Sequence, residues 1–134
     1  MDSILETFRA ALEAGDPAPI VATFSADIEL HSPAIVGPEY RGLDIVASIV
    51  TAAMQVLKDV RVADILHAED GATAGVVFAA RVRDLPAQGF MLLRAEGECI
   101  TELTLLLRPL AALSAFVSAM AALGAQPALD AGAE

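Results

Sequence analysis

Hydrophobic residues recur every three or four positions over the first dozen residues, which predicts an amphipathic helix. Gly15 ends this helix, and a second, short helix begins at the Asp16-Pro17 pair. Aspartate accepts the free amide hydrogens of a first turn, and proline fits there without losing a bond. A longer apolar stripe after Gly42 predicts a third helix, with Asp44 as its expected cap.

Five further segments are predicted as strands, and in the first of them apolar and polar residues alternate as in a half-buried strand. They are Asp27 to His31, Val60 to His67, Thr73 to Arg83, Gly89 to Ala95 and Ile100 to Arg108. The last two are apolar on both faces, so each needs cover from two layers. Helices would supply one layer and a second subunit the other.

Turn residues separate these strands. Pro33 and the Gly37-Pro38 pair end the first strand, Asp70-Gly71 predicts a hairpin turn that tolerates positive φ, and the segment from Asp84 to Gln88 predicts a turn that contains Pro86. A last helix opens at Pro109. The order predicts one α+β domain over residues 1–124, with helices packed on a strongly curved mixed or antiparallel sheet and a flexible tail over residues 125–134.

Composition narrows the function classes. A formal net charge of −10 repels phosphate backbones and anionic lipids, so we expect neither nucleic acid nor a membrane as partner. No apolar run approaches the roughly 20 residues that span a bilayer. The N-terminus lacks a basic region before its apolar positions, so we expect no signal peptide. One cysteine, Cys99, fits a reducing cytoplasm.

Three segments carry a resemblance to a known family: LEAGDPAPIVATFSADIELHSP, the YRG before the long helix, and GECITELTLLLRP near the end. Together with the element order, they resemble the SnoaL-like branch of the nuclear transport factor 2 superfamily. The resemblance implies an α+β cone with an internal pocket, and a stretch from Ala26 to Gly42 at the lip of that pocket. It does not imply one activity, because members include isomerases, cyclases, hydrolases, dehydratases and binding domains.

Ketosteroid isomerase, one such relative, needs an aspartate base and an oxyanion hole made by a tyrosine and a protonated aspartate. The resemblance places Phe8 at the tyrosine position, Ser32 at the base position and Met91 at the second acid. Phenylalanine donates no hydrogen bond, and an unaided serine is no base near neutral pH. These residues therefore disfavour ketosteroid isomerisation, although all three are expected to contact a pocket ligand.

Limonene epoxide hydrolase uses an Asp-Arg-Asp constellation. Arg81 fits the arginine position, but Arg83 and Leu105 occupy the aspartate positions, so this chemistry is disfavoured as well. SnoaL-like cyclases use an aspartate or histidine base, for which His31 is the candidate. The parity of His31 opposes that of Ile28 and Leu30, which points its side chain away from a pocket unless a bulge precedes Pro33.

The remaining polar candidates have two readings each. Ser32 and Tyr40 either line the pocket or only end a strand and cover a helix. Arg81, Glu102 and Thr104 either form a polar pocket floor, where Glu102 needs an arginine to stay ionised, or belong to a solvated ladder of ion pairs.

We see no cluster of metal ligands in the sequence, no phosphate-binding glycine loop and no GxSxG, and we expect no metal and no cofactor. Three hypotheses remain. The first is a domain that binds a small, largely apolar molecule in the cone. The second is a cyclase, isomerase or hydratase that uses His31, Tyr40 and Arg81. The third is a homodimeric interaction module with no catalysis.

Overall fold

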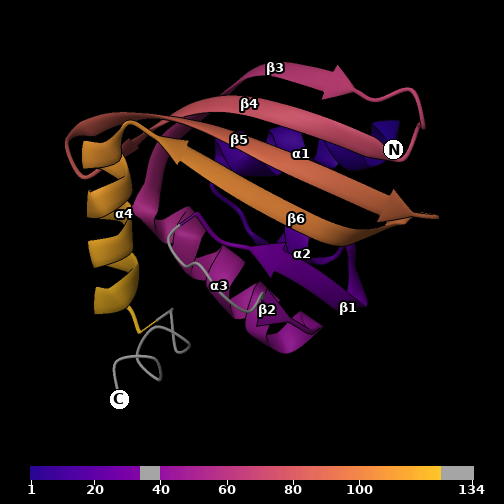
Figure 1. The fold of residues 1–134 in the computed structure, drawn as a ribbon, viewed down its shortest axis with the longest axis horizontal. Helices are drawn as coiled ribbons and strands as arrows, with labels where there is room; N and C mark the ends of the chain where they lie inside the picture. The colour runs from indigo at the N-terminus through magenta and orange to yellow at the C-terminus, as the bar shows by residue number, and fades with distance from the viewer. Residues whose placement is uncertain (34–39, 125–134) are drawn as a thin grey trace.

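The fold is a curved sheet covered on one side by helices (Figure 1), as seen in a computed structural model that describes residues 1–33 and 40–124. The helices are α1 (Asp2–Ala14), α2 (Ala18–Val21), α3 (Leu43–Val56) and α4 (Leu110–Ala122). The strands are β1 (Phe24–His31), β2 (Tyr40–Arg41), β3 (Leu57–His67), β4 (Thr73–Val82), β5 (Leu85–Glu96) and β6 (Cys99–Arg108). This confirms the predicted α+β class and element order.

The helix ends follow the sequence signals with one exception. α1 stops where Gly15 adopts a left-handed conformation, and the Asp16 carboxylate accepts the Ala18 amide at 3.2 Å at the start of α2. The prediction that Asp44 caps α3 is wrong, because α3 already begins at Leu43 with Gly42 as its N-cap. Asp44 instead lies inside the first turn, where its charge complements the helix dipole.

The sheet has the order β2-β1-β6-β5-β4-β3 and is mixed. β3 to β6 form an antiparallel meander, whereas β1 runs parallel to β6, with Glu29 opposite Glu102 and His31 opposite Thr104. The first strand of the chain therefore lies beside the last. This pairing brings residues about seventy positions apart onto neighbouring strands.

Two local predictions need correction. The turn before β5 is short, since Val82 pairs with Leu85, and Pro86 lies within the strand. Proline is tolerated there because β6 pairs with β5 only from Gln88 onward, so no neighbour on that side requires an amide hydrogen. Tyr40-Arg41 forms a short strand that was not predicted and pairs with β1. The Gly37-Pro38 stop and the tail over residues 125–134 lie outside the described residues.

The two faces of the sheet differ in what covers them. The inner face packs against α1, α3 and α4, and its side chains join the helices in one hydrophobic core. From β4, β5 and β6 the fully buried members include Val76, Phe78, Leu93 and Ile100. In the described part of the chain, no helix covers the outer face. None of the described helices has the length and apolarity to cross a bilayer.

Candidate functional site

The interior of the cone contains a small apolar cavity of about 60 Å³. It lies between the inner face of the sheet and the helices. Its walls come from every layer of the fold: Phe8, Leu12, Ile20, Leu30, Ser32, Pro33, Ile49, Val50, Ala53, Met54, Leu57, Phe78, Met91, Leu103, Leu105, Phe116 and Met120. Among these described residues, the Ser32 hydroxyl is the only polar side-chain group other than thioether sulfur.

Three predicted ligand contacts meet at this cavity. Phe8 from α1, Ser32 from the end of β1 and Met91 from β5 all line it, and Phe8 and Met91 are buried. These are the positions at which the resemblance to ketosteroid isomerase requires acids and a tyrosine. The structure therefore brings these three positions together at the cavity, and none of the three side chains can act as an acid or a base near neutral pH.

Tyr40 is buried beside Leu30, its partner in the β1–β2 ladder, and does not line the cavity. Its hydroxyl has no hydrogen-bond partner within the described residues. Burial disfavours the charged tyrosinate and so raises the pKa of Tyr40 above its ordinary value. Tyr40 is thus a core residue whose hydroxyl is unsatisfied within the described residues. Unlike Ser32, it does not contact the cavity.

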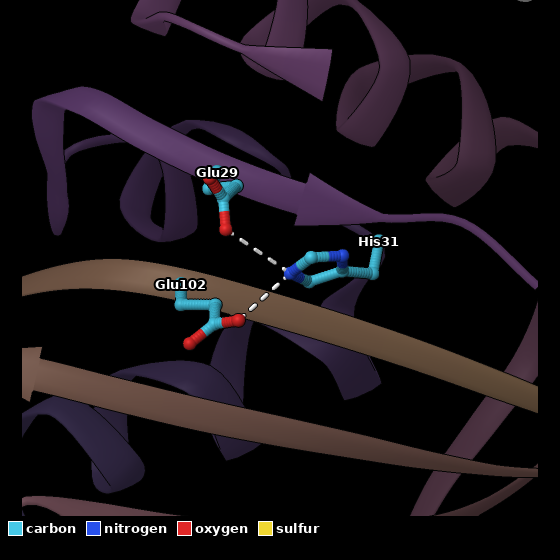
Figure 2. Close-up of side chains that lie close together, drawn as sticks. All are labelled: Glu29, His31 and Glu102. Carbon is cyan, nitrogen blue, oxygen red and sulfur yellow. Dashed lines mark hydrogen bonds and ion pairs between the residues drawn. The ribbon is translucent and has the colours of Figure 1, made fainter. Parts of the chain in front are cut away.

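His31 lies on the outer face of the sheet, as its parity in the strand predicts. Its Nε2 is 2.7 Å from Oε2 of Glu102 on β6 and 3.3 Å from Oε2 of Glu29 on β1. Figure 2 shows the three side chains converging between the two parallel strands. Each is partly exposed, and all three ligand atoms lie within 4.8 Å of one another. We call these three residues the Glu29-His31-Glu102 cluster.

Two arginines complete the surroundings of the cluster. Arg94 on β5 points its Nε at Oε1 of Glu102 at 3.2 Å, and Arg41 on β2 contacts Oε1 of Glu29. Each glutamate therefore directs one oxygen at His31 and the other at an arginine. The arginine that pairs with Glu102 is Arg94, its direct partner in the β5–β6 register, and not Arg81.

The other polar candidates lie elsewhere. Arg81 is exposed on the outer face of β4, where its Nε is 4.0 Å from Oδ2 of Asp59. Thr104 is opposite His31 on β6, on the same outer face. The structure thus unites Phe8, Ser32 and Met91 at the cavity, and His31, Glu102 and Thr104 outside it. It does not bring Tyr40 or Arg81 to either group.

The sequence analysis missed Glu29, and with it the cluster. The alternation did place Glu29 and His31 on one face of a strand, which was the available signal. The pairing of that strand with β6 was not available from local pattern. It also missed the contribution of Met54, Phe116 and Met120 to the cavity wall.

Fold and site together define an α+β cone with an apolar interior and a polar cluster on the outside of its sheet. A SnoaL-like domain family matches residues 5–103 of the chain. The protein therefore belongs to the SnoaL-like domain family, a branch of the nuclear transport factor 2-like superfamily. A comparison with curated proteins finds no match.

Solved structures share the fold. An uncharacterised protein with a cystatin-like fold from Silicibacter pomeroyi DSS-3 is 25% identical, with a TM-score of 0.83 over 91% of this chain and 85% of its own. A steroid delta-isomerase from Pseudomonas aeruginosa is 21% identical, with a TM-score of 0.85 over 96% and 93%. A putative polyketide cyclase from Pseudomonas putida KT2440 is 18% identical, with a TM-score of 0.64 over 82% and 92%.

Proposed function

We propose that this SnoaL-like domain binds a small, largely apolar molecule in its cone. The observation that supports the proposal is the chemistry of the cavity wall, which is aliphatic, aromatic and thioether except for the Ser32 hydroxyl. Ligand pockets are mostly apolar with a few polar groups that fix orientation. Ser32 would supply such a group, as a donor or acceptor to one polar atom of the ligand.

The cavity must expand for this role. Drug-sized ligands occupy pockets of about 300 to 1,000 Å³, whereas this one measures about 60 Å³. Three of the wall residues are the methionines Met54, Met91 and Met120. Methionine is unbranched and rotates about several bonds, so it adapts to a ligand at low cost. We expect binding to move these side chains more than the backbone.

The catalytic alternative has less support. A cyclase, isomerase or hydratase that used His31, Tyr40 and Arg81 would need them around one substrate. Instead His31 and Arg81 lie on the outer face, and Tyr40 lies in the core apart from the cavity. Among the described wall residues there is no carboxylate, imidazole or guanidinium to move a proton. The likeness to the steroid delta-isomerase and the polyketide cyclase is one of fold, and it does not support a similar reaction.

The test is a thermal-shift screen of uncharged apolar molecules of graded size, followed by calorimetry and a search for product with each hit. We expect some hits to raise the melting temperature and to remain chemically unchanged. Met91→Ala should widen the accepted range of sizes. Ala53→Leu should weaken binding by filling the cavity from α3.

Leu92→Ala is the matched control. Leu92 follows Met91 on β5 and its substitution also removes a large apolar side chain, but it points to the outer face. It should lower stability without altering ligand affinity. Hits whose affinity ignores both Met91→Ala and Ala53→Leu would mean that the cone is not the site. A screen without hits would reject the proposal, and turnover of a hit that is lost in His31→Ala would establish the enzyme alternative.

We also propose that the outer face of the sheet joins two copies of the chain. Val77, Phe90, Leu92 and Leu106 form an uncharged patch there, and Leu106 is 54% exposed. A net charge of −10 opposes association elsewhere on the surface, so an uncharged patch is where two copies would meet. A cytoplasmic location, which rests on the single cysteine, remains a prediction that cell fractionation would test.

A further inference from the structure

The Glu29-His31-Glu102 cluster combines two carboxylates and an imidazole from two strands that run side by side. Parallel pairing fixes the positions of these side chains. Glu29 is opposite Glu102, and His31 is the next residue of β1 that points to the same face. The three side chains point at one another (Figure 2). The backbone ladder thus holds in place three groups that each offer a lone pair.

The spacing of the three atoms suits a metal ion. Zinc bonds to imidazole nitrogen and carboxylate oxygen measure about 2.0 to 2.2 Å, so ligand atoms on one ion lie about 3 to 3.5 Å apart. The observed separations from His31 Nε2 are 2.7 Å to Glu102 and 3.3 Å to Glu29. The two glutamate oxygens lie within 4.8 Å of each other, so side-chain rotations that shorten this separation would place all three atoms around one ion.

The arginines act as supports for such a site. Ligating carboxylates in metal proteins are usually held by further hydrogen bonds that orient them. Here Arg94 holds the far oxygen of Glu102, and Arg41 holds the far oxygen of Glu29. In both glutamates the oxygen nearer His31 is the one that an ion would use.

The cluster is also accessible from solvent, and the charges around it attract cations. The side chains of Glu29, His31 and Glu102 are 22%, 29% and 32% exposed. Beside them is a polar hollow of about 300 Å³ on the outer face, lined by Asp27, Glu29, Arg41, Glu96, Thr101 and Glu102. The four carboxylates outnumber the two arginines that pair with them, Arg41 and Arg94, so the hollow has a net negative charge that attracts cations.

We propose that the Glu29-His31-Glu102 cluster binds a divalent transition-metal ion of the zinc class. An imidazole ligand favours zinc, cobalt or nickel over magnesium and calcium, which prefer oxygen alone. Three protein ligands leave at least one coordination position for water or a small anion. The site is on the opposite face of the sheet from the cavity, so it is independent of the ligand proposed for the cone.

The experiment is calorimetric titration of the chelator-treated full chain with zinc chloride, alongside Glu102→Gln, Glu29→Gln and His31→Ala. We expect one ion per chain. Loss of even a supporting residue costs about 10- to 100-fold in metal affinity, so each ligand variant should lose at least that much. Magnesium chloride in excess should not compete. Circular dichroism would verify that each variant is folded. If His31→Ala does not fold, the near-isosteric Glu102→Gln still tests the site.

The matched controls are His67→Ala and Cys99→Ser, which remove the other histidine and the exposed thiol. Both should retain wild-type affinity. The cobalt-loaded protein should lack the thiolate charge-transfer band that binding at Cys99 would produce. Absence of binding, or affinity that depends on His67 or Cys99 but not on Glu102, would overturn the proposal and leave the cluster as an ion-pair network.

Discussion

The ring of Phe78 on β4 lies directly over Gly89, its partner on β5, in the space where any other residue would place its Cβ. Phe78 is buried and forms part of the cavity wall. The absence of a side chain at Gly89 therefore decides how deeply that ring sits and contributes to the size of the cavity. A similar pair exists on the outer face, where the ring of Phe90 lies over Gly75.

The two glycines differ in how freely the covering ring can move. Gly89→Ala should lower the free energy of unfolding by about 1 to 3 kcal/mol, the usual cost of overpacking, because Phe78 is 1% exposed and surrounded by core. Gly75→Ala is the control, since Phe90 is half-buried and can swing outward. Gly75→Ala should lose less free energy of unfolding. Alanine has less backbone entropy than glycine in the unfolded chain, which offsets part of that loss. Urea denaturation of both variants tests this, and equal losses would contradict it.

Tyr40 gives a second prediction. A buried hydroxyl without a partner costs about 1 to 3 kcal/mol, so Tyr40→Phe should raise the free energy of unfolding by up to that amount. Tyr40→Ala should instead cost about 3 to 5 kcal/mol, because it removes the buried ring. Thermal denaturation measures both. A clear loss in Tyr40→Phe would show that the hydroxyl has a partner beyond the described residues.

The raised pKa of Tyr40 also sets a pH dependence. The folded protein holds the phenolic proton more tightly than the unfolded chain does, so the resulting stability is present below the ordinary pKa of 10.0 and is lost as pH rises past it. The chain has one tyrosine and no tryptophan, so tyrosinate absorbance reports on Tyr40 alone. We expect that absorbance to appear at a higher pH in the folded chain than in urea. Coincident titrations would contradict burial of the hydroxyl.

Local pattern predicted the helices and the meander strands, because each depends on neighbouring residues, but it left open whether His31 faces the pocket. Phe8, Ser32 and Met91 were placed together through the family resemblance. The partners of His31 could not be predicted in the same way. Glu102 reaches His31 only because β1 pairs with β6 in parallel, and that pairing is set by tertiary packing, not by either strand.

Asp70 gives a prediction for the β3–β4 hairpin. Its carboxylate accepts the amides of Ala72 and Thr73 and the Thr73 hydroxyl, each at 2.9 Å. Hydrogen bonds from Ala72 and Thr73 lower the pKa of Asp70 below its ordinary value. This contribution is present above pH 3.8 and is lost as pH falls through the lowered pKa. Asp70→Ala should therefore lower the melting temperature at neutral pH, and the difference from wild type should shrink in acid. Glu69→Ala, at an exposed neighbour, should change neither.

The uncharged patch on the outer face gives the last prediction, which concerns assembly. If two copies meet through Val77, Phe90, Leu92 and Leu106, sedimentation at micromolar concentration should show about twice the 13.9 kDa of one chain. Leu106→Glu should shift the equilibrium to monomer, because two copies would each bury a carboxylate against an apolar surface. Leu66→Glu is the control, since Leu66 is 51% exposed on β3 and lies outside the patch. A wild-type monomer, or a dimer that tolerates Leu106→Glu, would exclude this face as the interface.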